Sequence, residues 1–389
     1  MEKETGRQLC RLLAEGLHEK QFSVPESKEE QKQIQELAKR HKVLSLLYRA
    51  WEDDLQVQKI SRQTVQQSYH LLFFSRYVIQ FLADHNIPAV LLKGSAAAQY
   101  YPVPELRKSG DVDLLLENEA QVKAAWECLS EHGFTREHGQ EACHHVACES
   151  PEHICVELHS SMVEPFDNAK TNERIKKQQE ECFSHIETKP LMGLPLPVLE
   201  NPYHAYHLLL HMLQDFLRAG FGLRLLCDWV VFWEQGCSRE EALTFQRLVR
   251  ESRIEGFAIA MTAVCVHYLG LAPEKVSFWD ARIQELPLEQ VDALLDEIIE
   301  AGEFGASDNS RMVTLRGNHL EDYIREFHHQ TMLTYPKAGR YPILFPILWI
   351  CTLCGFLYRN RSLRGVSGIQ VLKNAGKRSK LVEKMKLFQ

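Results

Sequence analysis

The spacing of apolar residues in the first 84 positions predicts helices. Apolar residues recur at intervals of three and four in TGRQLCRLLAEGL, KEEQKQIQELAKRHKVLSLLYRAWEDD and RQTVQQSYHLLFFSRYVIQFLADH, and none of these segments contains a proline. The intervening QFSVPES, which carries Pro25, breaks the pattern. We therefore expect an N-terminal helical region over residues 1–84.

From residue 85 the pattern changes to short apolar runs separated by turn residues. NIPAVLLKG and GDVDLLLE predict strands, whereas SAAAQYY and NEAQVKAAWECLSEHGF predict helices. CHHVACESPEHICVELH predicts two strands that turn at Ser150 and Pro151. This alternation indicates an α/β (α+β) core with a mixed sheet, which we place at residues 85–170.

The rest of the chain, residues 171–389, is predicted to be a C-terminal helical domain. Helical spacing is evident in LPLPVLENPYHAYHLLLHMLQDF, LRLLCDWVVFWEQ, REEALTFQRLVRE and FAIAMTAVCVHYLG. The run YPILFPILWICTLCGFLY, residues 341–358, has the length of a short membrane span, but Pro342 and Pro346 leave only about 11 to 12 residues without a helix break. We expect a core helix there and keep two alternatives, a peripheral membrane contact through residues 341–389 and a true span.

Composition narrows the functional classes. The formal net charge of -7 argues against a non-specific grip on a long nucleic acid, which needs a basic surface. The N-terminus MEKETGRQLC has no apolar segment of the signal-peptide type. The 11 cysteines form no small-domain disulfide framework, and together these features predict a cytoplasmic protein.

Three carboxylates are the strongest chemical signal in the predicted core. Side chains alternate between the two faces of a strand, so Asp111 and Asp113 share one face while Val112 lies on the other. The same alternation places Glu157 and His159 on the polar face of the later strand. If these strands are neighbours, the three carboxylates repel one another unless a cation lies between them, and hard oxygen ligands of this kind suit Mg²⁺.

A phosphate-binding turn is predicted sixteen residues upstream of Asp111. Gly94 permits close approach of a ligand to the backbone, and the helix that opens at Ser95 directs its amides and dipole towards an anion. Lys93, Arg107 and Lys108 could add positive charge on the same nucleotide.

These residues resemble the uncharacterised nucleotidyltransferases, a bacterial group within the DNA-polymerase-beta-like nucleotidyltransferase superfamily. The superfamily pattern is a Gly-Ser turn, an Asp-x-Asp on a strand and a later carboxylate, and here these are Gly94-Ser95, Asp111 with Asp113, and Glu157. The subgroup features are Leu92-Lys93-Gly94, Arg107 and Glu157-Leu158-His159, and the resemblance extends to HKVLSLLYRAW and HLLLHMLQDFLRAGFGLRLLCDW. The long connection YPVPELRKS departs from minimal members of the superfamily.

The resemblance implies a nucleotidyl transfer reaction. A nucleoside monophosphate would pass from a nucleoside triphosphate to an acceptor hydroxyl, with release of pyrophosphate. Two Mg²⁺ ions, or Mn²⁺ in their place, would be held by the catalytic residues Asp111, Asp113 and Glu157. The nucleotide would contact Lys93, Gly94, Ser95, Arg107 and Lys108. The acceptor stays open between a small molecule, a peptide, a protein and a polysaccharide precursor, and a non-catalytic nucleotide- or partner-binding protein of the same fold is the alternative.

Histidines are the remaining candidates for the site. His145 and His159 on the strands, and His207 and His211 on a later helix, are candidates to face the substrate. For the two helix residues, which continue a polar stripe with His204, the favoured alternative is an interdomain polar face with hydrogen-bonded histidines. A zinc site among the cysteines and histidines of residues 143–159 is less favoured, because their spacing matches no closed zinc module. Arg224 and Asp228, four residues apart, are predicted to form a salt bridge along a helix.

Overall fold

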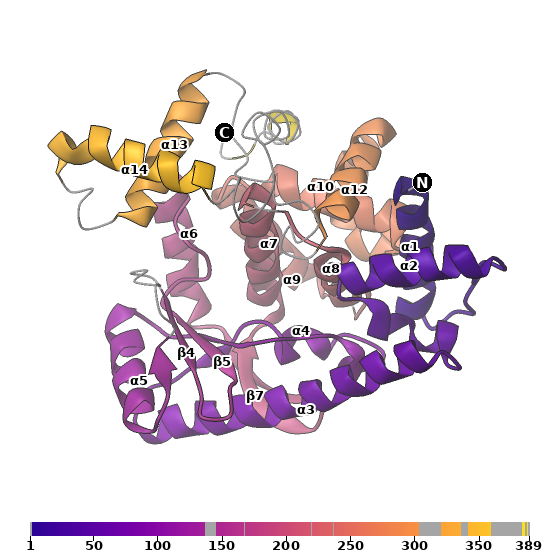
Figure 1. Cartoon of the computed structure of the whole chain (residues 1–389), viewed down its shortest axis with the longest axis horizontal. Coiled ribbons are helices and arrows are strands. Elements are labelled where there is room, and N and C mark those ends of the chain that lie inside the picture. Colours follow the sequence, from indigo (N-terminus) through magenta and orange to yellow (C-terminus); the bar gives the residue numbers. More distant parts are fainter. Residues whose placement is uncertain are drawn as a thin grey trace.

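The computed structural model describes residues 2–136, 145–166, 168–218, 220–235, 237–302, 320–335, 341–358, 383–385 and 387. Figure 1 shows a layer of strands with helices packed around it. The N-terminal helices are α1 (Glu2–Leu17), α2 (Lys28–Arg40), the 3-10 helix η1 (Leu44–Trp51) and α3 (Leu55–Asp84). The helical prediction for this part of the chain is confirmed.

The predicted core begins with β1 (Val90–Leu91), α4 (Ser95–Ala98), η2 (Pro104–Leu106), β2 (Val112–Leu115) and α5 (Glu119–Glu131). It continues with β3 (Thr135–Arg136), β4 (His145–Glu149), β5 (Cys155–His159) and α6 (Ala169–Cys182). The turn between β4 and β5 lies at Ser150 and Pro151, as predicted, and β3 is an additional short strand.

The strands form one mixed sheet in the order β3-β4-β5-β2-β1-β7-β6. The pairs β2–β5 and β1–β7 are parallel, whereas the other neighbours are antiparallel. The mixed α/β fold predicted from the sequence is therefore confirmed.

Two strands of this sheet, β6 (Ile186–Leu191) and β7 (Leu194–Leu199), lie beyond the predicted core range. The sequence pattern placed a polar connector before residue 194 and assigned LPLPVLE to a helical segment, and the strand at Leu194–Leu199 shows that the helix assignment there is wrong. A two-residue turn joins the strands, with positive φ at Met192 (43°) and Gly193 (86°), the backbone geometry of a tight hairpin. The sheet thus extends past residue 170, and the division into three regions stays a prediction.

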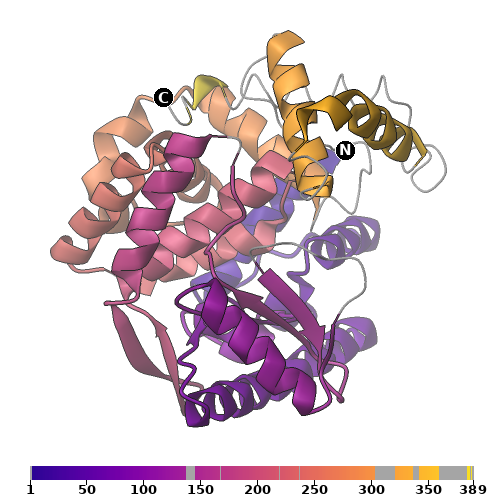
Figure 2. The ribbon, with the colours of Figure 1, turned by 90° about the vertical axis from the view of Figure 1, so that its left-hand side faces the viewer.

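The two faces of the sheet pack into different cores. Val112, Leu114, Val156 and Leu158 point into a core shared with α5 and the C-terminal half of α3. Side chains of the opposite parity, such as Leu115, join a larger core built from the helices that follow β7. Figure 2 shows these helices stacked above the sheet layer. The polar face predicted for β2 and β5 is therefore turned towards the helices.

The helices after β7 are α7 (Asn201–Arg218), α8 (Leu223–Gln235), α9 (Arg239–Glu251), α10 (Glu255–Tyr268), η3 (Pro273–Trp279), α11 (Asp280–Gln284) and α12 (Leu288–Ala301). They share one hydrophobic core with α1, α2 and η1, so helices from the start of the chain pack against the helices that follow β7. The larger core thus joins residues from both predicted helical regions.

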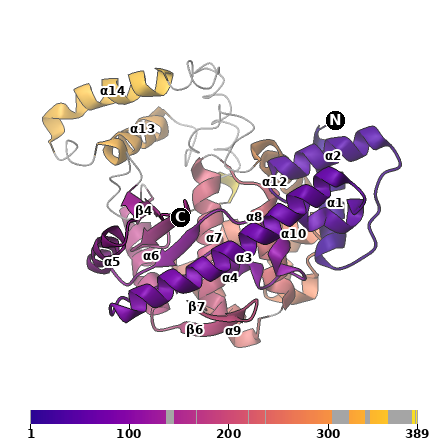
Figure 3. The same ribbon diagram turned by 60° about the horizontal axis from the view of Figure 1, so that its bottom comes forward.

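The final helices are α13 (Leu320–Thr334), η6 (Pro342–Leu344) and α14 (Phe345–Tyr358). Figures 1 and 3 show α13 and α14 projecting from the rest of the molecule. The expectation of a core helix at 341–358 is wrong for one side of α14, because Ile347 and Ile350 are 60% and 62% exposed. Among the described helices, none combines the length and the apolar character needed to cross a membrane.

Helix α7 buries a histidine that the structure leaves without a polar partner. His204 is 1% exposed and lies 5.5 Å from the ring centroid of Tyr100 and 5.9 Å from that of Phe232. Neither of its ring nitrogens has a hydrogen-bond partner within the described part of the chain. Burial lowers the pKa of His204 to about 3.

His204 should therefore make the fold sensitive to acid. The folded pKa lies below the unfolded value of about 6.5, so its stabilising contribution is present above pH 6.5 and is lost as the pH falls towards 3. We expect His204→Phe to be as stable as the wild type at pH 7.5. Between pH 6 and 4 the unfolding free energy of the wild type should fall with decreasing pH, and the variant should lack about 1.4 kcal/mol per pH unit of that fall. Urea unfolding at several pH values measures this slope, and an unchanged slope would contradict the assignment.

Candidate active site

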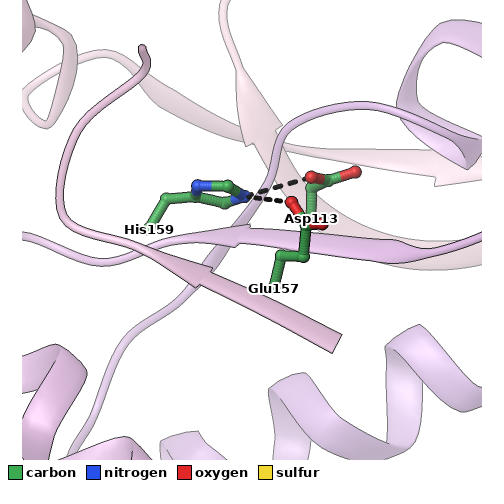
Figure 4. Close-up of side chains that lie close together, drawn as sticks. All are labelled: Asp113, Glu157 and His159. Carbon is green, nitrogen blue, oxygen red and sulfur yellow. Dashed lines mark hydrogen bonds and ion pairs between the residues drawn. The ribbon is translucent and has the colours of Figure 1, made fainter. Parts of the chain in front are cut away.

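The polar face of the sheet brings two of the predicted carboxylates together. The parallel register of β2 and β5 pairs Asp113 with Glu157. His159 Nε2 lies 3.1 Å from Asp113 Oδ1 and 3.2 Å from Glu157 Oε2 (Figure 4). The three side chains offer ligand atoms within 4.8 Å of one another. The expected adjacency of β2 and β5 is confirmed. His159, which we had expected only to face the substrate, is a member of the cluster.

Asp113 is the buried centre of this cluster, with 1% of the residue exposed. The Lys93 ammonium lies 2.8 Å from Asp113 Oδ1, and it is held there by the end of β1, where the Leu92 amide donates to the Asp113 carbonyl. Burial alone raises the pKa of Asp113, but the charge of Lys93 and the hydrogen bond from His159 outweigh it and hold that pKa well below its usual value. Asp113 is therefore ionised because positive groups surround it.

The positive partners are perturbed in the complementary direction. Burial lowers the pKa of His159, yet its hydrogen bonds to Asp113 and Glu157 dominate and raise it to about 9. Burial likewise opposes the charge on Lys93, while Asp113, Asp111 and Glu157 raise the pKa of its ammonium group above the ordinary value. Two cations thus offset the charge of the carboxylates in the structure.

Asp111, the third predicted carboxylate, stands slightly apart. It precedes β2 and is not part of the close cluster of Asp113, Glu157 and His159. Burial, followed by the charge of Asp113, raises the pKa of Asp111. Asp111 lines the same cavity as Glu157 and His159, whereas the buried Asp113 is not among the residues of that lining.

The cluster has the features of a cation site. Asp113 Oδ2 is buried and has no hydrogen-bond partner within the described residues, which leaves one oxygen available to a ligand. The two carboxylates suit Mg²⁺ or Mn²⁺, whereas His159, whose Nε2 donates to both of them, would have to lose its proton and turn from them before it could bind a metal. The residues present therefore fit the predicted divalent metal.

A cavity of about 390 Å³ opens beside the cluster, within the size range of small-molecule sites. It lies between the polar face of the sheet and helices α7 and α8, because His207, His211, Arg224 and Asp228 line it together with Asp111 and Glu157. Of the predicted nucleotide-binding residues, the lining includes Lys93, Gly94, Arg107 and Lys108.

Gly94 has the backbone geometry that made it a candidate. Its φ of 58° with ψ of -113° is a conformation that side-chain-bearing residues rarely adopt. Ser95, by contrast, is 6% exposed and does not belong to the cavity lining, and α4 is only four residues long. A nucleotide role for Ser95 is therefore less directly supported by the geometry than one for Gly94.

Arg107 makes an internal ion pair that local sequence analysis missed. Its Nε and Nη2 donate to the two carboxylate oxygens of Asp228, each at 2.7 Å, and Nη1 donates to Ser109 Oγ at 2.7 Å. Tyr101 Oη also donates to Asp228, at 2.7 Å. The oxygens of Asp228 accept from residues of the β1–β2 connection, and the predicted pairing of Asp228 with Arg224 along the helix stays a prediction. Arg107 and Asp228 are 121 positions apart, so no local sequence pattern predicts their ion pair.

The predicted substrate-facing histidines differ in their surroundings. His145 on β4 lies with its ring 5.8 Å from that of His159. His207 and His211 line the cavity from α7, and burial followed by the charge of Lys93 lowers the pKa of each well below its usual value. Both are therefore neutral at pH 7. Cys143 and His144, part of the less favoured zinc hypothesis, lie outside the described residues.

The Arg107–Asp228 pair should be needed for folding. Removing one partner leaves a buried charge uncompensated, so Arg107→Met should lower the free energy of unfolding by about 3–5 kcal/mol. Arg107→Met combined with Asp228→Leu should recover most of that loss. Arg11→Met, which breaks the exposed Arg11–Glu15 pair, should cost less than about 1 kcal/mol. Urea unfolding measures all three, and an Arg107→Met protein as stable as the Arg11→Met control would contradict a structural role.

Comparison with known proteins identifies the family of the chain. Residues 27–270 match the model of a family described as uncharacterised nucleotidyltransferase. A solved structure, the crystal structure of an antigenic nucleotidyltransferase-like protein from Paracoccidioides brasiliensis, is similar at 16% identity and a TM-score of 0.30, over 46% of this chain and 88% of that chain. No curated protein matches. Because the family model covers more than half of the 389 residues, the chain belongs to the uncharacterised nucleotidyltransferase family.

Proposed function

We propose that the protein is a divalent-metal-dependent enzyme that transfers a nucleoside monophosphate from a nucleoside triphosphate to a hydroxyl of an acceptor. The observation that carries the proposal is the Asp113–Glu157 pair across β2 and β5, beside a cavity and with one buried Asp113 oxygen unpartnered. Family membership supports nucleotidyl transfer as the reaction class.

In this proposal Asp113 and Glu157, with Asp111 beside them, hold the metal, Mg²⁺ or Mn²⁺. The bound cation would neutralise charge on the triphosphate and on the phosphorus centre under attack. Two ions, as the resemblance implies, are part of the proposal.

The chain's own residues would position the reactants. Lys93 and Lys108 lie where they can pair with phosphate oxygens, and Gly94 lets the nucleotide approach the backbone. Glu157, more exposed than Asp113, can take the proton of the attacking hydroxyl. The new bond joins the acceptor oxygen to the α-phosphorus, the bond from that phosphorus to the bridging oxygen breaks, and pyrophosphate leaves.

A non-catalytic nucleotide-binding protein is the second candidate. It is favoured by one observation, that Lys93 and His159 both lie against Asp113 Oδ1, where a cation would otherwise bind. Such a protein would be stabilised by a nucleotide without transferring any part of it. The acceptor, whether a small molecule, a peptide, a protein or a polysaccharide precursor, is needed only by the enzyme.

The test is transfer of label from each common α-phosphate-labelled nucleoside triphosphate, with Mg²⁺ or Mn²⁺ and a cell extract as the acceptor source. We expect label in an acceptor and release of pyrophosphate. Asp113→Asn and Glu157→Gln should lower transfer by at least about a hundredfold, because each removes a proposed ligand charge. Glu152→Gln, in the exposed turn between β4 and β5, should transfer as the wild type does.

Thermal unfolding distinguishes the two candidates. A rise in melting temperature with the metal and a nucleoside triphosphate, in a protein that transfers no label and releases no pyrophosphate, would support the non-catalytic candidate. Full transfer by Asp113→Asn would remove the basis of the assignment.

A further inference from the structure

A second cavity adjoins the candidate active site. It has a volume of about 580 Å³ and lies between the end of α2, η1 and α3. Lys42, Gln67 and Lys108 line both cavities, so the two are neighbours across these three side chains. We call the second cavity the side groove.

The side groove differs in charge from the active-site cavity. Among the residues that the structure describes, its lining includes Lys39, Lys42, Lys108 and His70 but no aspartate or glutamate, whereas the active-site cavity is lined by carboxylates as well as by basic residues. Lys39 is paired with Glu36 at 2.7 Å, outside that lining. Gln63, Gln66 and Gln67 add amide groups along α3. Such a lining suits an anion with several oxygen acceptors.

We propose that the side groove binds a phosphate or carboxylate group of the acceptor, while the acceptor hydroxyl reaches the active-site cavity past Lys42 and Lys108. The inference rests on the proposed function. Asp111 and Glu157, two of the proposed metal ligands, line the active-site cavity, so the proposed function puts the triphosphate there and leaves the adjoining basic groove for the second substrate.

Lys42 offers a variant that removes a charge without straining the backbone. It follows α2 with a φ of 54°, a left-handed conformation that asparagine adopts more readily than most residues. Lys42→Asn therefore removes the charge from the groove at a backbone-compatible position. Arg253 follows α9 with a φ of 58° and lines neither cavity, so Arg253→Asn is a matched control.

The first measurement uses inorganic phosphate as the probe. The full chain is saturated with Mg²⁺ and a non-hydrolysable nucleoside triphosphate analogue, and millimolar phosphate is then added while the melting temperature is followed. We expect phosphate to raise the melting temperature of the wild type and of Arg253→Asn but not of Lys42→Asn. No response in the wild type, or an equal response in Lys42→Asn, would overturn the proposal. A Lys42→Asn protein that no longer responds to the nucleotide analogue would overturn it as well, by placing Lys42 at the triphosphate.

The second measurement identifies the source of the anion. The cell extract is divided by anion exchange, and each fraction is offered as acceptor with labelled triphosphate. We expect transfer to the bound fraction, and Lys42→Asn should need about tenfold more of it for half-maximal transfer, with little change in the maximal rate. Phosphatase treatment of that fraction should abolish transfer if the group is a phosphate and leave it unchanged if it is a carboxylate. Transfer confined to the unbound fraction would overturn the proposal, whereas failure of the proposed function would show as no transfer and no pyrophosphate at all.

A separate observation concerns α14, which has one packed side and one bare side. Phe345 and Trp349 pack on His328 of α13, with ring centroids 4.9 Å and 5.8 Å apart. Ile343, Ile347, Ile350 and Leu353 are exposed, Ile343 at 86%. Figure 3 shows α14 on the outside of the molecule, beyond α13.

The residues of this exposed side suit contact with a lipid surface. No charged residue occurs from Tyr341 to Tyr358, and Arg359, Arg361 and Arg364 follow directly in the sequence. Exposed aliphatic side chains that a basic segment follows in the sequence match the acyl and anionic headgroup layers of a membrane, and α14 is too short to cross one. The geometry points to α14 as a helix that lies on an anionic membrane surface.

Vesicle flotation of the full chain tests this assignment. Wild type should float with phosphatidylcholine vesicles that contain phosphatidylserine and much less with phosphatidylcholine alone. Ile343→Ser, Ile347→Ser and Ile350→Ser combined should lower the bound fraction by about tenfold. Leu243→Ser with Leu288→Ser, which replaces exposed leucines of α9 and α12, should bind as the wild type does. Equal flotation of the isoleucine variant and the wild type would overturn the assignment. A wild type that does not bind the vesicles would also overturn it, even if the protein self-associates through the same isoleucines.

Discussion

Compensation of the buried charge on Asp113 is the constraint on which the site depends. A carboxylate that is almost fully removed from water is strongly disfavoured unless positive groups contact it. Lys93, at the end of β1, and His159, at the end of β5, supply those groups at 2.8 Å and 3.1 Å. The strand order that places β1 and β5 on either side of β2 is therefore the same order that makes Asp113 tolerable in the fold.

The same requirement joins the sheet to the helices. Arg107 lies in the long connection between β1 and β2, and its buried guanidinium finds its counter-charge in Asp228 on α8. Tyr101, from the same connection, donates to the same carboxylate. The connection that looked like an extra loop in the sequence is thus anchored to α8 by a buried polar network, which forms one wall of the active-site cavity.

Much of the sheet could be predicted because strand alternation is a local property. The two-residue period placed Asp113, Glu157 and His159 on polar faces from the sequence alone, and the register of β2 with β5 brought them together. Features that depend on distant partners could not be predicted in this way. The pairing of Arg107 with Asp228 spans 121 positions, and the prolines of β6 and β7 concealed a hairpin whose place beside β1 is set by tertiary packing.

Lys93 connects the free protein with the proposed complex. In the structure its ammonium compensates Asp113, while the neutral His207 and His211 on α7 add no charge to the cavity. A triphosphate accompanied by a metal ion brings both an anion for Lys93 and a cation for Asp113. One lysine can then compensate the carboxylate before binding and the phosphate after it, so the local charge is offset in both states. Under the proposed function, the Lys93–Asp113 ion pair would therefore hold the site ready for nucleotide and metal to enter together.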